Sequence, residues 1–236
     1  MAGDLYLLPS TLGATSPEIY LPAGVIKILH RLKLFFAEDI RTARRFIKST
    51  GYPDNISIVT FYELSEHTTP VETERLLQVL QAAGEAGLIS EAGLPAVADP
   101  GATLVHLCHR HGIRVHPLTG PSSIMLALMA SGMNGQHFTF HGYLPRDPAQ
   151  RRRKLRMLEQ ECNVSGNSQV FMETPYRNLA LLKDILQTCH KDTWLCIAAG
   201  LTTDYEFIDT RQTGLWERKL PDIHKIPAIF IVGKPQ

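Results

Sequence analysis

The sequence lacks the features that most quickly assign a protein to a membrane, redox or nucleotide-binding class. Its longest apolar runs, Ile124–Ala130 and Ile226–Val232, are far shorter than the roughly 18 residues of a membrane span. The four cysteines form no Cys-x-x-Cys pair, which argues against a zinc knuckle or a redox dithiol. Neither Gly-x-Gly-x-x-Gly nor Gly-x-x-x-x-Gly-Lys-Ser/Thr occurs, so a nicotinamide dinucleotide fold and a P-loop nucleotidase lose most of their support.

An excess of one charge is lacking as well. The 236 residues include 24 Lys and Arg against 23 Asp and Glu, a formal net charge of +1. Any site for a polyanion must therefore be a local patch. The acid at Asp4 and the proline at Pro9 do not suit a secretory signal. We expect free thiols, no membrane association and a cytoplasmic location.

What is present is a regular alternation of short β-prone runs with helical patterns. In the first half the expected strands are Leu5–Leu8, Leu34–Ala37, Ile56–Phe61, Ala86–Ser90 and Ile113–Pro117, and the expected helices cover 22–31, 39–50, 69–83 and 100–111. The second half has expected helices at 121–131, 148–161 and 175–189, and strands at 137–141, 168–172, 193–198, 205–210 and 226–232. This order predicts two α/β domains, residues 1–117 and 118–236. The first should have a mostly parallel sheet and the second a mixed sheet.

The most informative loop follows the expected strand Ala86–Ser90. This loop is about eight residues long, and most of these are small residues, glycine or proline. Connections of this kind are usually two to six residues long. Small residues let a ligand approach main-chain amides and carbonyls closely. A plain connection is the alternative. Asp99 is expected to be the N-cap of the next helix and Pro100 its first residue.

A second loop of this kind runs through Leu118-Thr119-Gly120-Pro121 into the helical pattern that starts near Ser122. Both loops lie at the carboxyl ends of expected strands, where open α/β sheets bind ligands. Ser122 and Ser123 suit a helix cap equally well, and Met125 and Met129 are expected in the core.

Five longer segments resemble one known family. They are AEDIRTARRFI (37–47), GLISEAGLPAVADPG (87–101), VHPLTGPSSIMLALMASGM (115–133), FTFHGYLPRDPAQRRRKL (138–155) and FMETPYR (171–177). In this order they resemble the tetrapyrrole methylase superfamily, and within it the branch that 2′-O-methylates a cytidine of small-subunit ribosomal RNA. The resemblance implies a methyltransferase that uses S-adenosylmethionine, bound in a cleft between two α/β domains. It also implies a homodimer, with ribosomal RNA or the small ribosomal subunit as partner.

The resemblance also implies which residues bind the cofactor. They are Gly93, Leu94, Pro95, Val97, Ala98, Gly120, Ser122, Ser123, Phe171, Met172, Leu201, Thr202, Pro227 and Ala228. Some polar positions depart from the RNA-methylating branch, such as Ala199-Gly200-Leu201-Thr202-Thr203 in place of Arg-Glu-Leu-Thr-Lys. Two alternatives therefore stay open: a methyltransferase acting on a tetrapyrrole or other small molecule, and a non-catalytic protein that binds S-adenosylmethionine.

A ribose hydroxyl is a poor nucleophile and would profit from a general base. Glu91 is the first candidate because it lies inside the expected cofactor loop, and Glu38, Asp39 and Glu173 are further candidates. Each has a plainer role available: a first-turn helix acid for Glu38 and Asp39, a loop acid for Glu91, a solvated rim charge for Glu173. Asp99 is expected to be a cap rather than a base.

Two basic segments suit contacts with RNA phosphates. They contain the candidate substrate-binding residues Arg41, Arg44, Arg45, Arg151, Arg152 and Arg153, although a solvated helix face explains each segment equally well. The group His106, Cys108, His109 and His111 does not place its side chains on one helix face and has no acid nearby in sequence. No metal is expected.

Overall fold

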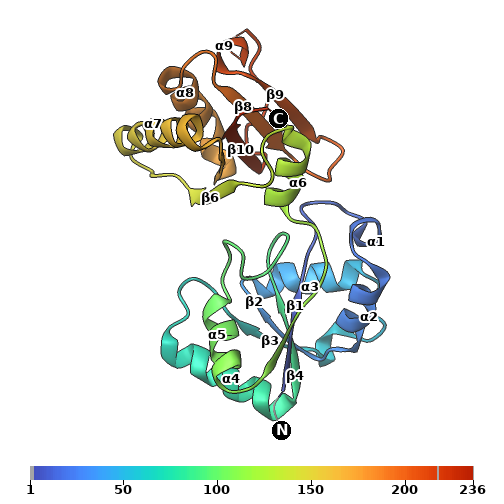
Figure 1. Ribbon diagram of the computed structural model, residues 1–236. Helices are drawn as coiled ribbons and strands as arrows, with labels where there is room; N and C mark the ends of the chain where they lie inside the picture. The colour runs from blue at the N-terminus through green and yellow to red at the C-terminus, as the bar shows by residue number, and fades with distance from the viewer. Residues whose placement is uncertain (1–2, 217, 236) are drawn as a thin grey trace. The chain divides into compact units, whose positions relative to one another are not determined.

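The computed structural model describes residues 3–216 and 218–235. The chain divides into two compact units, Met1–Ser122 and Ser123–Gln236 (Figure 1). The sequence predicts a division after Pro117, which is the last residue of the final strand of the first unit. The loop that contains Gly120 therefore belongs to the first unit, and the second unit begins with a helix.

The sheet of the first unit is entirely parallel. Its strands are β1 (Asp4–Leu8), β2 (Leu34–Ala37), β3 (Thr60–Glu63), β4 (Glu85–Ile89) and β5 (Arg114–Pro117). They lie in the order β3-β2-β4-β1-β5, and every neighbouring pair is parallel. The predicted parallel sheet is confirmed, so all five strands end at the same edge.

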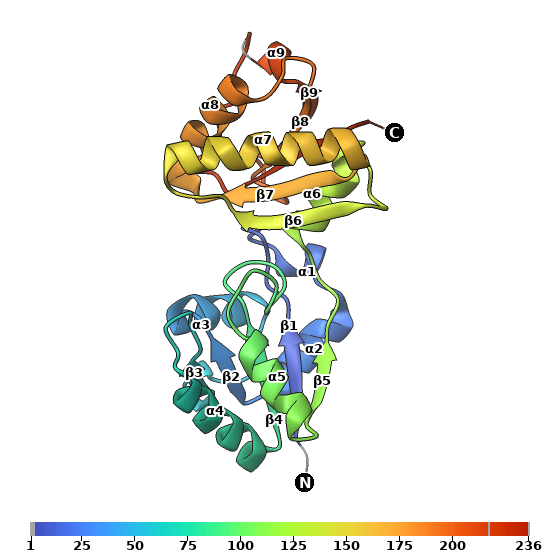
Figure 2. The ribbon, with the colours of Figure 1, turned by 60° about the vertical axis from the view of Figure 1, so that its left-hand side comes forward.

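Helices cover both faces of this sheet (Figure 2). They are α1 (Pro17–Tyr20), α2 (Ala23–Arg31), α3 (Ile40–Ser49), α4 (Pro70–Ala83) and α5 (Ala102–Arg110), with a 3-10 turn at Ile56–Ile58. Successive strand residues point to opposite faces. Phe35 therefore packs with α2 and α3, and Phe36 packs with α4 and α5. This two-sided burial explains why the inner strands β2 and β4 are almost wholly apolar, whereas the edge strands β3 and β5 contain polar residues.

The start of α5 corrects one prediction. The N-cap is Gly101, with no side-chain cap hydrogen bond, and the helix begins at Ala102 rather than at Pro100. Asp99 lies two residues before the N-cap, and the positive φ of +123° at Gly101 separates Asp99 from the helix. Asp39, by contrast, caps α3 by accepting a hydrogen bond from the Thr42 amide.

The second unit contains a mixed sheet, as predicted. Its strands are β6 (Phe138–Tyr143), β7 (Ser168–Glu173), β8 (Trp194–Ala199), β9 (Phe207–Gln212) and β10 (Ala228–Gly233). Their order is β6-β7-β10-β8-β9. The pair β6 and β7 is parallel, whereas β10 pairs antiparallel with both β7 and β8, and β8 with β9.

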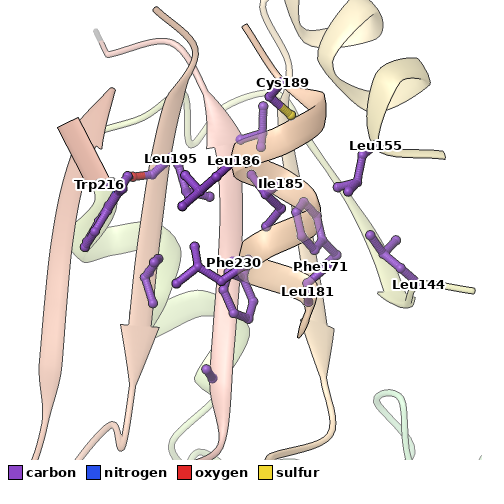
Figure 3. Close-up of a cluster of buried hydrophobic side chains, with 14 of the residues drawn as sticks. Leu144, Leu155, Phe171, Leu181, Ile185, Leu186, Cys189, Leu195, Trp216 and Phe230 are labelled. Carbon is purple, nitrogen blue, oxygen red and sulfur yellow. The ribbon is translucent and has the colours of Figure 1, made fainter. Parts of the chain in front are cut away.

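The main core of this unit lies between the sheet and three of its helices (Figure 3). The helices of the unit are α6 (Ser123–Ser131), α7 (Pro148–Ser165), α8 (Asn178–Thr188) and α9 (Thr213–Trp216), with a 3-10 turn at Pro175–Arg177. Phe171 and Phe230 stack across β7 and β10 with ring centroids 6.1 Å apart. The helices α7, α8 and α9 supply the other walls of this core.

Two expectations for the helices of the second unit are wrong. Arg151 is 4% exposed, and its Nε donates to Asp184 over 2.7 Å, so it joins α7 to α8 instead of facing solvent. Asp184 also accepts from Arg152 over 3.0 Å. On α6, Met125 and Met129 are 45% and 77% exposed rather than in the core.

The four cysteines are free, as the sequence predicts, and all four are buried. Burial raises the pKa of the Cys108 thiol to about 11 and that of Cys189 to about 12. Within residues 3–216 and 218–235, no helix is long and apolar enough to cross a membrane.

Candidate active site

The first unit gathers three loops at the carboxyl edge of its sheet, after β1, β4 and β5 (Figure 2). The chain leaves β1 toward β2 and leaves β4 toward β5, in opposite directions across the sheet. Two neighbouring strands whose connections run in opposite directions form a switch point, where open α/β sheets bind ligands. The sequence-predicted loops 90–101 and 118–122 both lie here.

Main-chain contacts hold the three loops together. The Ser10 amide donates to the Gly93 carbonyl over 2.9 Å, and the Ser90 hydroxyl donates to the same carbonyl over 2.9 Å. A Cβ on Gly120 would lie 2.2 Å from the Cβ of Pro9, closer than real Cβ atoms come. Gly120 is therefore required for the loop after β5 to pack against the loop after β1.

The loop between β4 and α5 has a contorted backbone. Gly93, Ala96, Ala98 and Gly101 all have positive φ, at 80°, 63°, 55° and 123°. For the two alanines this conformation costs free energy, and such costs concentrate at binding sites. Pro95 is buried, while Val97 and Ala98 are exposed. The loop therefore presents main chain and small side chains to solvent, with Pro95 as its anchor.

Carboxylates collect beside this loop. Asp99 forms a side-chain hydrogen bond with Glu38, which follows β2 at the same edge of the sheet. Burial, followed by the Glu38 charge and the shared hydrogen bond, raises the pKa of Asp99 to about 7. Burial and the charge of Glu91 raise the pKa of Glu38. Two carboxyl groups that share a hydrogen bond hold one proton between them, so this pair is a proton acceptor and donor near neutral pH.

In the second unit, three candidate segments meet at one end of the sheet. Ala228 at the start of β10 pairs with Glu173 at the end of β7 and with Ala199 at the end of β8. The Gly200 amide donates to the Pro227 carbonyl over 3.0 Å, which joins the turn after β8 to the residue before β10. The segments that contain Met172, Leu201, Thr202, Pro227 and Ala228 thus meet at this end of the sheet.

Thr202 is the most informative residue of this end. It has φ +68°, and its hydroxyl oxygen is buried without a hydrogen-bond partner among the described residues. A buried hydroxyl without a partner costs free energy, so such a group in a binding site indicates a missing polar ligand. Phe171 differs, because its side chain lies entirely in the core and only Met172 beyond it is partly exposed.

Glu173 is not a solvated rim charge. It is 3% exposed, and its Oε1 accepts from the Thr174 amide over 2.6 Å and from Arg177 over 2.5 Å. The carboxylate therefore fixes the turn Pro175–Arg177 that follows β7. This contact removes Glu173 from the candidate bases, because a base has to reach a substrate proton.

The candidate substrate-binding arginines lie on α3 in the first unit and on α7 in the second. Arg41, Arg44 and Arg45 are exposed on α3, and the Arg44 guanidinium lies 5.1 Å from the centre of the Phe61 ring. On α7, Arg153 is exposed, Arg152 is half-buried against Asp184, and Arg151 is internal. In the part of the chain that the structure describes, no three His, Cys, Asp or Glu side chains are grouped to hold a metal ion.

Comparison with known proteins decides the family. The model of the tetrapyrrole (corrin/porphyrin) methylases matches residues 15–212, most of both units. The chain belongs to this family. Its members are methyltransferases, and this protein is one by class.

Two relatives of this methylase share one name. The chain is 30% identical to the ribosomal RNA small subunit methyltransferase I of Escherichia coli O157:H7, over 98% of this chain and 77% of that protein. It is 34% identical to the protein of the same name from Leptospira borgpetersenii, over 99% of this chain and 89% of that protein.

Solved structures confirm the fold. The uroporphyrin-III C-methyltransferase of Thermus thermophilus has a TM-score of 0.61 at 17% identity, covering 98% of both chains. Cobalt precorrin-4 methyltransferase has a TM-score of 0.62 at 13% identity, covering 98% of this chain and 94% of the other. At these identities the likeness extends to the fold alone.

The candidate residues of this methylase suit a polar cofactor that carries amino-acid and nucleoside groups. Such a ligand needs many hydrogen bonds of both kinds, which exposed main chain provides without bulky side chains. In the first unit, the backbone of loop 93–98 fits that requirement. Sequence reasoning found both loops but missed the contact between Glu38 and Asp99, because the two residues are 61 positions apart in the chain.

Proposed function

We propose that this methylase uses S-adenosylmethionine to methylate a ribose 2′-hydroxyl of a cytidine in small-subunit ribosomal RNA. The observation that carries the proposal is the contorted, small-residue loop 93–98 at the carboxyl edge of the parallel sheet. The names of the relatives support the choice of acceptor.

In this proposal the main chain of the first unit binds and orients the methyl donor. When bound, S-adenosylmethionine supplies an electrophilic methyl group on a sulfonium centre. The binding residues that we propose in the first unit are Gly93, Leu94, Pro95, Val97, Ala98, Gly120, Ser122 and Ser123. In the second unit we propose Met172, Leu201, Thr202, Pro227 and Ala228, with the Thr202 hydroxyl as the side-chain contact. Positioning is the main catalytic contribution of such residues in a displacement reaction.

The carboxylates beside loop 93–98 take the proton of the acceptor hydroxyl. Glu91 is the exposed member, and Glu38 with Asp99 forms the half-buried pair. A base works best when its pKa lies near the working pH, which the pKa of about 7 at Asp99 provides. The proposal therefore assigns proton acceptance to this cluster, with Glu91 as the member nearest to solvent.

Arginines of both units that reach solvent at least in part hold the RNA backbone. On α3 these are Arg41, Arg44 and Arg45, and on α7 they are Arg152 and Arg153. Such contacts position RNA without reading its sequence. Arg151 has no part in them, because its guanidinium is buried against Asp184.

The test is a methylation assay with labelled S-adenosylmethionine. Small ribosomal subunits from a strain that lacks the corresponding methyltransferase are the acceptor, and nuclease digestion locates the label. The expected result is 2′-O-methylcytidine. Transfer only to porphyrin or corrinoid acceptors would overturn the RNA assignment, and tight donor binding without any transfer would overturn the enzymatic one.

We also propose that the enzyme works as a homodimer in the cytoplasm, where ribosomal subunits are found. The four free, buried thiols agree with a reducing compartment. Light scattering after size-exclusion chromatography measures the mass directly. A mass of one chain at micromolar concentration would contradict the dimer.

A further inference from the structure

Strained backbone points to one residue that the proposed function does not use. Among the described residues, four that are not glycine have positive φ, namely Ala96, Ala98, Thr202 and Lys225. The first three belong to the segments that we propose bind the donor. Lys225 has φ +61° and lies two residues before Pro227, in the loop that leads into β10. Such conformations cost free energy and persist where the surrounding structure imposes them, often at binding sites.

Hydrogen bonds hold Lys225 beside the turn that follows β7. The amide of Lys225 donates to the Pro175 carbonyl over 3.2 Å. The side chain of Asn178, the first residue of α8, donates to the carbonyl of Ile226. The turn Pro175–Arg177 and the loop before β10 are therefore fixed to each other by main-chain carbonyls on both sides.

Tyr176 is the middle residue of this turn. It is 74% exposed, the largest exposed fraction of any aromatic residue in the described part of the chain. The ammonium of Lys225 lies 5.9 Å from the centre of its ring. Because the turn is already fixed, only the side chain has to be ordered when a ligand binds, which lowers the entropic cost. A large exposed ring on fixed backbone is suited to stacking against a planar group.

The loop before β10 adds positive charge beside the ring. Residues 218–225 include the exposed cations Arg218, Lys219 and Lys225, against one exposed acid, Asp222. Of these cations, Lys225 is the one that lies over the exposed ring. Proteins bind single-stranded RNA with cations that contact phosphates and with aromatic rings on which bases stack. The combination therefore favours RNA over an uncharged ligand or a protein partner.

The ring lies near the end of the second sheet where the proposed donor segments meet. Tyr176 follows β7 by three residues, and Glu173 at the end of β7 pairs with Ala228. Lys225 lies two residues before Pro227, whose carbonyl accepts from the turn after β8. A base stacked on this ring would thus be bound close to the donor segments of the same unit.

We propose that Tyr176 and Lys225 form a stacking subsite for an unpaired base of the RNA substrate. The base stacks on the ring of Tyr176, and the ammonium of Lys225 contacts a neighbouring phosphate. Lysine has a long flexible side chain, so its ammonium can turn from the ring to the phosphate as the base arrives. The proposal rests on the proposed function and adds a substrate contact in the second unit. It predicts no choice among bases, because every base has a face that stacks.

The test measures the affinity of the full chain for two probes of equal length, by fluorescence anisotropy at low salt. One probe is oligocytidylate, and the other is an abasic ribose-phosphate oligomer with the same phosphate charge and no bases. Tyr176→Ala should bind oligocytidylate about tenfold more weakly than wild type, as the loss of one stacked base predicts. Its affinity for the abasic probe should not change. Tyr176→Phe keeps the ring and should bind both probes like the wild type.

Removal of the cation should act on both probes. Lys225→Gln keeps most of the side chain and loses the charge, so both affinities should fall a few-fold. The slope of log affinity against log salt should decrease by about 0.7, as expected for one lost phosphate contact on single-stranded RNA. The matched control is Lys183→Gln, because Lys183 is exposed on α8 and lies outside the turn and the loop. It should behave like the wild type.

Three results for Tyr176→Ala would overturn the subsite. They are an unchanged affinity for oligocytidylate, an equal loss of affinity for both probes, and tenfold weaker calorimetric binding of S-adenosylmethionine, which would assign the ring to the donor. If the first result comes with lost methylation of ribosomal subunits, the ring contacts a ribosomal protein instead of RNA. Equal salt slopes in the two lysine variants would remove Lys225 from the subsite.

The fate of the proposed function is read separately. Each of these results leaves methylation of ribosomal subunits by the wild type untouched, so the proposed function would survive the loss of the subsite. If instead the wild type methylates no RNA and binds neither probe, the proposed function itself fails.

Discussion

The two units of this methylase stabilise their candidate sites by different means. In the first, glycine and proline main chain interlocks three loops, and Gly120 against Pro9 leaves no room for a side chain. In the second unit, ion pairs that include a buried carboxylate hold the structure together, with Arg151 against Asp184 and Arg177 against Glu173. Loops of small residues leave backbone free for a ligand, whereas buried ion pairs stiffen a scaffold.

The largest expected effect comes from breaking the buried pair of the second unit. Asp184→Ala leaves the Arg151 guanidinium buried without its partner, and we expect the free energy of unfolding to fall by about 3–5 kcal/mol. Tryptophan fluorescence in a denaturant titration measures this, because Trp194 and Trp216 both belong to the second unit. The matched control, Arg153→Ala, removes an exposed arginine of α7 and should stay within about 0.5 kcal/mol of wild type. Equal losses for both variants would contradict the distinction.

The next effect tests the interlocked loops of the first unit. Gly120→Ala forces Pro9 and the neighbouring loop apart, so we expect a loss of about 1–3 kcal/mol and weaker binding of S-adenosylmethionine. Circular dichroism and calorimetry measure the two quantities. Gly24→Ala is the control, because a Cβ at that position on α2 meets nothing within 4 Å and should be neutral or stabilising by up to about 1 kcal/mol. If both substitutions weaken donor binding equally, the packing argument for Gly120 is wrong.

A smaller effect concerns pH. The pKa of Asp99 is raised to about 7 in the folded protein, from an ordinary value of 3.8. Between these values the folded state holds a proton that the unfolded state has lost, so stability decreases as pH rises from about 4 through 7. Asp99→Asn removes this titration. We expect its melting temperature to exceed that of wild type more at pH 8 than at pH 5. A constant difference across that range would show that Asp99 titrates normally.

The smallest expected effect concerns the exposed arginines of α3 in the first unit. Arg41→Ala should weaken binding of single-stranded RNA only a few-fold, without changing base preference. One lost phosphate contact should reduce the slope of log affinity against log salt by about 0.7. Lys27→Ala on α2 removes an exposed cation that the proposed RNA contacts do not include, and it serves as the control. The same slope in all three proteins would mean that α3 does not contact phosphate.

Local patterns were enough to predict much of this fold. The predicted strand Leu34–Ala37 coincides with β2, because a short run of apolar residues between polar ones is typical of a strand that is buried on both faces of a sheet. Both small-residue loops were found for a similar reason, since glycine and proline impose backbone geometry locally. The short helices α1 and α9 were missed, because four-residue helices carry no period.

Side-chain partners could not be read in this way. Arg151 and Arg153 stand in one run of arginines, and only the position of α8 decides which is internal. Asp99 has the sequence of a helix cap, but left-handed residues on either side turn it toward Glu38 instead. In both cases the side-chain partner lies far away in the chain, and a local pattern carries no information about it.

The four buried cysteines have a practical consequence. A thiolate is the reactive form, and burial both shields these thiols and raises their pKa, so disulfide reagents should modify them only when the protein opens. Cys108 lies in the first unit, whereas Cys162, Cys189 and Cys196 lie in the second. The rate at which each thiol is modified, read by mass spectrometry of peptides, therefore reports separately how often each unit opens. The natural sequence thus contains a kinetic probe in both units, without any engineered label.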